Sequence, residues 1–162
     1  LASSKRHGDH LHAIVAPFLL GKDHPLYNVD DVFNAVFVRG NMLGDAMFYG
    51  SGAGKLPTAS AVVADVVDEA KHLHRNIMTM WKSEKLELEP VEDTSRRFFI
   101  RISGNTDERK AEAEKCFGSG KIIHADGLDD EFGYMTESMT EGDYRKKAEG
   151  FEGILGMIRA ED

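Results

Sequence analysis

The sequence predicts an α+β protein: a small mixed or antiparallel sheet with a long helix, followed by a ferredoxin-like β-α-β-β-α-β module. Alternating apolar residues near the start of the chain predict strands, and apolar residues spaced three and four apart after Pro57 predict the long helix. The elements expected after Arg96 follow the ferredoxin-like order. The 162 residues suffice for one ordinary domain or two small ones.

The first part of the chain is expected to form strands. His10–Leu20 alternates partly between apolar and polar residues, as a half-buried strand does. Two more strands are predicted at Val32–Arg39 and Met42–Gly50, joined by Gly40-Asn41, a dipeptide typical of a two-residue hairpin turn. Three successive strands predict a small, largely antiparallel sheet.

A glycine-rich loop, Gly50 to Lys55, leads into the long helix. Pro57 suits a first helical turn, and Thr58 suits a cap. The helix is expected to end between His74 and Asn76. Its apolar face consists of residues four, four and three positions apart: Val62, Val66, Ala70 and Leu73.

The composition changes after this helix. Residues 77–95 are highly charged and lack apolar periodicity, which predicts a linker between a first region, 1–76, and a second region, 96–162. The elements expected in the second region are, in order, strand Phe98–Ser103, helix Thr106–Phe117, strands Lys121–Ala125 and Phe132–Met139, helix Glu141–Glu149 and strand Ile154–Arg159.

Charge and composition exclude several classes of function. Lys and Arg number 20 against 28 Asp and Glu, a net charge of −8, which argues against a nucleic-acid or anionic-membrane partner. No apolar run is long enough to span a bilayer. The single cysteine, Cys116, cannot form an internal disulfide and fits a reducing cytoplasm. The chain opens at Leu1 without methionine, so we expect a fragment or a processed product.

The glycine-rich loop is the strongest local candidate for a binding site, because a helix start after small residues favours an anion. A P-loop would need glycine in place of Tyr49 and Ser or Thr in place of Leu56. A dinucleotide fingerprint would need glycine where Lys55 or Pro57 stands. Both motifs are missing, so a tight strand-to-helix turn and a ligand contact stay open alternatives.

Three histidines near the start, His7, His10 and His12, are the candidates for metal ligands. A strand would place His10 and His12 on one face, but only Asp9 lies near enough in sequence to complete a set. We therefore expect a solvated hairpin and no metal site.

Four blocks closely resemble the end of the catalytic region of homoserine dehydrogenase. In chain order they are His24-Pro25-Leu26, Phe33-Asn34-Ala35-Val36, Gly50-Ser51-Gly52-Ala53-Gly54 and Pro57-Thr58-Ala59-Ser60-Ala61-Val62-Val63-Ala64-Asp65. In that family the following region is often an ACT regulatory domain with β-α-β-β-α-β order. The order expected for 96–162 agrees with this.

The resemblance implies an NAD(P)-dependent oxidoreductase that interconverts L-aspartate 4-semialdehyde and L-homoserine in threonine and methionine biosynthesis. The family places its Rossmann domain, catalytic lysines and substrate-binding carboxylates upstream of these blocks. The chain is therefore expected to hold no catalytic residue and to be inactive alone. Only Gly52, Ala53 and Gly54 carry over as cofactor-binding residues, for NAD or NADP.

The resemblance also bears on regulation and assembly. Amino-acid-binding ACT domains usually carry an Asp-x-Pro-Gly-like turn after their first strand, whereas Ser103–Glu108 here holds one glycine and no proline. Threonine binding there is therefore not inferred, and an amino-acid effector stays open. A homodimer or higher homo-oligomer is expected through the surface of Val62, Val66 and Leu73.

Two functions are alternatives to a homoserine dehydrogenase. The first is a non-catalytic, amino-acid-sensing ACT-type module whose first region only dimerises. The second, a P-loop nucleotide hydrolase, is contradicted by Tyr49 and Leu56.

Overall fold

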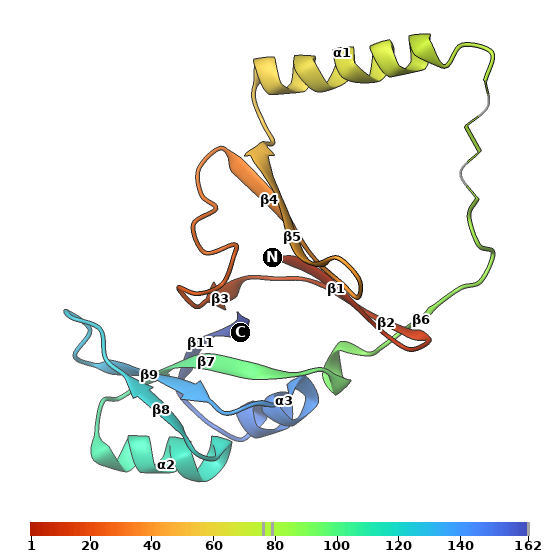
Figure 1. The fold of residues 1–162 in the computed structure, drawn as a ribbon. Helices are drawn as coiled ribbons and strands as arrows, with labels where there is room; N and C mark the ends of the chain where they lie inside the picture. Colours follow the sequence, from red (N-terminus) through yellow and green to blue (C-terminus); the bar gives the residue numbers. More distant parts are fainter. Residues whose placement is uncertain (76, 79, 162) are drawn as a thin grey trace. The chain divides into compact units, whose positions relative to one another are not determined.

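The computed structural model of the chain is drawn in Figure 1 and describes residues 1–75, 77–78 and 80–161, without the side chain of His7. Asn76, Thr79 and Asp162, which belong to the three predicted regions, lie outside the described residues. The chain divides into two compact units. The first unit combines Leu1–Leu20 with Lys85–Asp162, and the second unit is Gly21–Glu84.

The first unit is built around a six-stranded sheet. Its main path runs through β3 (Phe18–Leu20), β11 (Ile154–Glu161), β7 (Ser95–Ser103), β9 (Glu131–Thr136) and β8 (Gly120–Ile123). β7 pairs antiparallel with both β11 and β9, and β3 runs parallel to β11 at the edge. A short strand, β10 (Met139–Thr140), pairs with the start of β7.

Two helices, α2 (Asp107–Phe117) and α3 (Glu141–Glu149), cover one face of this sheet (Figure 1). Each begins at a threonine whose side chain accepts a hydrogen bond from the backbone N–H three residues later, which satisfies a donor of the first turn. Alternate residues of β7 point into the core between sheet and helices. The buried core consists of Phe98, Ile100, Ile102, Ala113, Phe117, Phe132, Tyr134 and Tyr144.

A second, three-stranded sheet lies in the same unit. β1 (Ala2–His7) and β2 (His10–Val15) form an antiparallel hairpin, and β6 (Glu87–Leu88) runs parallel to β2. A single 3-10 turn, η1 (Val91–Asp93), precedes β7. The predicted linker therefore contains two short elements, β6 and η1.

The predicted strand His10–Leu20 is wrong in its extent, because the chain leaves β2 after Val15 and Pro17 separates it from β3. The predicted sheet of three successive strands is also wrong. β3 joins β11, while the next two strands form a sheet of their own.

The second unit consists of a hairpin and a helix: β4 (Phe33–Gly40), β5 (Gly44–Ser51) and α1 (Lys55–Lys71). The predicted two-residue turn is wrong. Gly40 pairs with Gly44, so the turn comprises residues 41–43, and Gly44 has φ +76°. A residue in the left-handed region is typical of such three-residue hairpins.

The helix of the second unit begins and ends earlier than expected. α1 starts two residues before Pro57 and ends at Lys71, so Leu73 lies beyond it. In the second region the expected elements all occur within a few residues of their predicted bounds, and α3 has the predicted bounds. The mixed α+β class is therefore confirmed.

Candidate functional site

The glycine loop connects β5 to α1 and requires glycine at Gly54. This residue precedes the helix with φ 117° and ψ 155°, a conformation that residues with a Cβ rarely adopt. Its carbonyl accepts the first helical hydrogen bond, from the Thr58 N–H at 3.1 Å. The loop therefore turns sharply into the helix at Gly54.

Gly52 is required for a different reason, the approach of Asn34. A Cβ on Gly52 would lie 2.2 Å from Nδ2 and 2.7 Å from Cγ of Asn34. Asn34 belongs to β4 and pairs with Gly50 of β5. The loop thus packs on a residue from another of the four sequence blocks, a contact that the sequence analysis missed because nothing local signals it.

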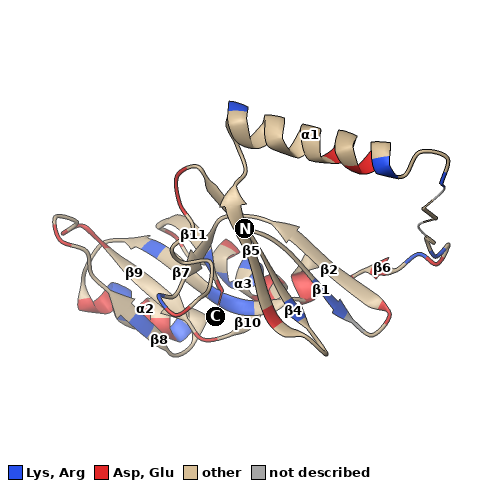
Figure 2. Cartoon of the chain, turned by 45° about the horizontal axis from the view of Figure 1, so that its top comes forward, with Lys and Arg blue, Asp and Glu red and all other residues tan. Residues whose placement is uncertain are grey.

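The start of α1 has the electrostatic character of an anion site. No side chain caps its first N–H groups, its first turn holds no acidic residue, and Lys55 is its first residue. Figure 2 shows the acidic residues of α1 in its C-terminal half. The partial positive charge of the helix start is therefore not neutralised by neighbouring carboxylates, so it favours an anionic group.

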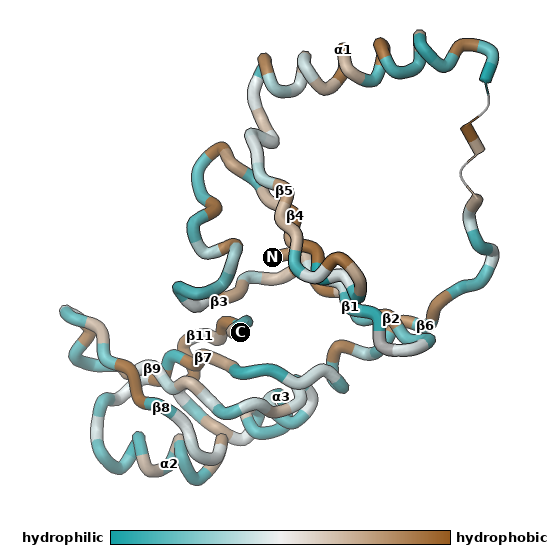
Figure 3. Tube along the Cα trace, viewed as in Figure 1, coloured by the Kyte–Doolittle hydropathy of each residue, from teal (hydrophilic) through white to brown (hydrophobic). Residues whose placement is uncertain are grey.

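The predicted apolar face of α1 is exposed, and the helix has no buried residue. Val62 is 56% exposed, Val66 63% and Leu73 62%. Apolar residues also lie along the hairpin of the second unit (Figure 3), where Val36 and Phe48 are exposed. Such a surface is typical of an interaction site.

The predicted histidine cluster does not gather other metal ligands. His10 is exposed, with Nδ1 3.9 Å from a carboxylate oxygen of Glu87, whereas His12 is buried. Among the described residues no group of three or more His, Cys, Asp or Glu side chains is placed to hold a metal ion. Cys116 is half-buried, and its Sγ donates to the carbonyl of Lys147 at 3.6 Å.

Within the described part of the chain, no helix combines the length and apolar character needed to cross a membrane.

Comparison with known proteins bears on the hairpin, the loop and most of α1. A sequence profile of the homoserine dehydrogenase family matches residues 1–67. Residues 1–67 are therefore similar to the homoserine dehydrogenase family. The matched range contains all four blocks on which the resemblance rests.

Curated homoserine dehydrogenases extend this match. The Synechocystis enzyme is 42% identical over 97 residues, which cover 54% of this chain and 22% of the relative. The Neisseria gonorrhoeae enzyme is 34% identical over 110 residues, covering 63% of this chain and 25% of the relative. The chain thus spans about a quarter of the length of the curated homoserine dehydrogenases it matches.

Solved structures carry the likeness beyond residue 67. A homoserine dehydrogenase from Thiobacillus denitrificans superposes with a TM-score of 0.77 at 26% identity, covering 98% of this chain and 41% of that chain. The Staphylococcus aureus enzyme at pH 7.0 gives a TM-score of 0.70 over 99% of this chain and 41% of that chain; at 23% identity this is a likeness of fold.

Proposed function

We propose that the chain is the C-terminal part of an NAD(P)-dependent homoserine dehydrogenase, which interconverts L-aspartate 4-semialdehyde and L-homoserine. The family match over residues 1–67, with the glycine loop and α1 inside it, carries this proposal. The upstream part of such an enzyme would hold the Rossmann domain and the catalytic residues, so this chain alone is expected to be inactive. A cytoplasmic location fits its single free cysteine.

The proposed regions are the end of the catalytic and dimerisation region at 1–76, a linker at 77–95 and an ACT-like regulatory domain at 96–162. The order β7-α2-β8-β9-α3-β11, with both helices on one sheet face, supports the ACT-like assignment (Figure 1). Packing divides the chain differently, because Leu1–Leu20 groups with the ACT-like residues.

The cofactor contact is proposed at Gly52, Ala53 and Gly54. When bound, NAD or NADP supplies the hydride acceptor of the reaction. The uncapped start of α1 fits a phosphate group of such a nucleotide, and Lys55 adds a positive charge beside it. The role of Gly52 in this loop is to leave room for the Asn34 side chain, which already fills the space beside the Gly52 Cα.

Self-association through the exposed apolar face of α1, as a homodimer or a higher homo-oligomer, completes the proposal. Val62 and Val66 lie on this face, with Leu73 just beyond the helix. Val66→Asp is expected to lower the oligomeric order in sedimentation velocity, whereas Thr58→Asp at the other end of α1 leaves it unchanged. An unchanged Val66→Asp assembly would contradict this surface.

A chimera tests the enzymatic proposal. Residues 1–162 replace the matching C-terminal segment of the Thiobacillus denitrificans enzyme, and homoserine-dependent NADP reduction is measured. We expect activity from the chimera, a loss of at least tenfold with Gly54→Val, and no activity from this chain alone. A folded, cofactor-binding chimera without activity, or turnover by the isolated chain, would contradict it.

Sequencing the coding region upstream of Leu1 adds a test that does not depend on folding, since a Gly-x-Gly-x-x-Gly turn between a strand and a helix is expected there.

A further inference from the structure

A polar cavity of about 290 Å³ lies within the first unit. It is lined by the β1–β2 hairpin, the segment that leads into β7, and the end of β11. The lining residues that matter here are Lys5, His12, Asp93, Thr94, Arg96 and Glu161.

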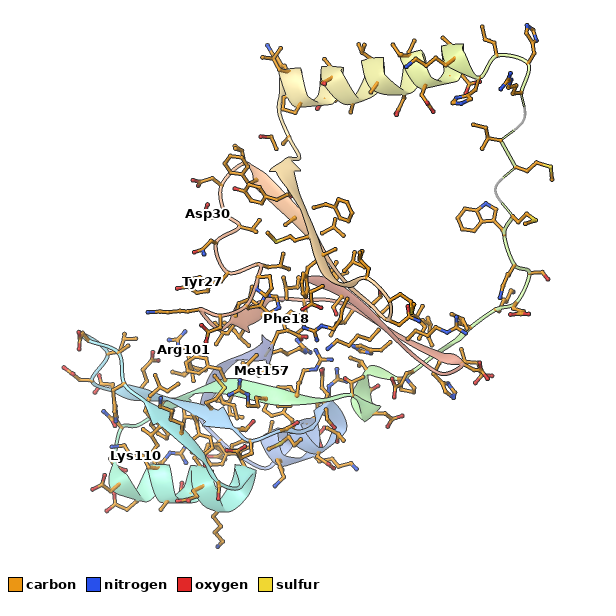
Figure 4. The ribbon with its side chains drawn as sticks, in the orientation of Figure 1. Phe18, Tyr27, Asp30, Arg101, Lys110 and Met157 are labelled. Atoms are coloured by element: carbon orange, nitrogen blue, oxygen red, sulfur yellow. The ribbon has the colours of Figure 1, made fainter. Side chains whose placement is uncertain are left out.

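The side chains that line this cavity are polar. Lys5 and His12 are paired across β1 and β2 and therefore share one sheet face. His12 is 4% exposed and Thr94 8%. One Arg96 nitrogen, Nη2, lies 3.1 Å from His12 Nε2 and donates to Thr94 Oγ1 at 3.1 Å. The Arg96 guanidinium also lies 5.4 Å from the ring centroid of Phe18, which Figure 4 labels.

Only some of the charged side chains that line the cavity form an ion pair. Lys5 Nζ forms an ion pair with Glu161 at 3.0 Å. Arg96 has no carboxylate partner in the described residues, and its buried Nε makes no hydrogen bond there. Asp93 is exposed and likewise makes no ion pair with any described residue. The half-buried Arg96 and the exposed Asp93 thus line one small space without forming an ion pair with one another.

We propose that this cavity binds a small zwitterion of the α-amino acid class, whose carboxylate pairs with Arg96 and whose ammonium group pairs with Asp93. A planar guanidinium suits a carboxylate, which accepts two of its N–H bonds at once. Phosphate fits less well, because Glu89, Asp93 and Glu161 also line the cavity and repel a dianion. The volume is just below the ~300 Å³ at which sites for drug-sized ligands begin, so the ligand is small.

This site does not depend on the proposed enzymatic function. It is also separate from the turn after β7, residues 103–108, which corresponds to the amino-acid-binding turn of ACT domains in the resemblance described above. It joins residues from the start of the family-matched region with residues of the ACT-like region, so binding there would tie the hairpin β1–β2 to β7 and β11.

The test is titration calorimetry on the 162-residue chain with each standard L-amino acid and with inorganic phosphate. We expect saturable binding by at least one amino acid and tenfold or greater weakening by Arg96→Gln or Asp93→Asn, since each variant removes a charged hydrogen-bond partner. The N-acetyl and methyl ester forms of the same amino acid are expected to lose affinity similarly.

One control variant and one fallback variant keep the result interpretable. Arg101→Gln changes another arginine of β7 that is paired with Glu131 outside the cavity, so it should leave affinity unchanged. If Arg96→Gln fails to give a native amide spectrum, the exposed Asp93→Asn carries the test. Absence of binding by every amino acid, insensitivity to both variants, or tighter competing binding of phosphate would overturn the proposal.

Discussion

Glu141→Ala is expected to destabilise the first unit by about 3 kcal/mol, because a buried carboxylate at the start of α3 holds two arginines. The Glu141 side chain is 0% exposed. Its oxygens accept from Nε of Arg159 on β11 at 2.9 Å and from Nη2 of Arg145 at 3.0 Å. Arg145 in turn donates to Glu92 of η1 at 2.7 Å, so the network joins α3, β11 and η1.

The magnitude follows from what alanine leaves behind. Removing one partner of a buried ion pair costs about 3–5 kcal/mol, since the remaining charge stays buried without a counter-charge. Arg159, whose side chain is 17% exposed, would keep its charge and lose the Glu141 counter-charge. Arg145 is 49% exposed and keeps Glu92, so it is solvated again. The lower end of the range therefore applies, and Glu141→Gln, which keeps the shape and a hydrogen-bond acceptor, should cost about 1–2 kcal/mol.

The same network makes stability depend on pH. The hydrogen bond from Arg159 lowers the pKa of Glu141, and this outweighs the opposite effect of burial. A folded-state pKa below the unfolded value of about 4.3 adds stability above that pH, and this stability is lost as the pH falls through the folded-state pKa. The stabilities of the wild-type chain and Glu141→Gln should therefore converge in acid.

Native-state hydrogen exchange of the β7 and β11 amides measures these effects in the first unit alone. Glu112→Gln is the matched control, because Glu112 pairs with Arg109 at 2.6 Å but is 56% exposed, and it should change stability by less than about 1 kcal/mol. The reasoning is refuted if Glu141→Ala stays within about 1 kcal/mol of wild type, or if the control costs as much.

Three further outcomes are expected. Gly52→Ala should displace the Asn34 side chain and shift its amide resonances in NMR spectra, whereas Gly50→Ala, with open space beside it, should not. Thr106→Ala should lower the free energy of unfolding by about 1 kcal/mol in urea titrations, and Thr106→Ser should restore most of it. Arg101→Gln, at an exposed ion pair, should stay within about 1 kcal/mol of wild type in the same titrations.

Local signals predicted most of the second region. Thr106 and Thr140 cap helices, and alternate apolar residues of β7 form the core, so element type and bounds follow from short stretches of sequence. β1 was not predicted as a strand because its residues are mostly polar. Its pairing with β2 supplies the backbone hydrogen bonds that its side chains do not signal.

Pairings between distant segments could not be read from the sequence. β3 lies parallel to β11, more than a hundred residues later, and no periodicity in either strand identifies the other. The candidate site shows the same limit. The sequence indicated the glycines of the loop, but the reason for Gly52 is Asn34, which approaches across the hairpin from β4.

An apolar pattern predicts both a helix and the burial of its apolar face, and in α1 only the helix is observed. The spacing of Val62 and Val66 correctly predicted a helix, yet the face they form is exposed, while the chain's buried apolar side chains gather around β7. An amphipathic helix in water derives most of its stability from packing of its apolar face. The helical state of α1 should therefore depend on a surface that covers Val62 and Val66. Val66→Asp tests this dependence. If Val66→Asp weakens assembly, it should also lower the helicity of α1, and if assembly is unchanged, the helicity should be unchanged.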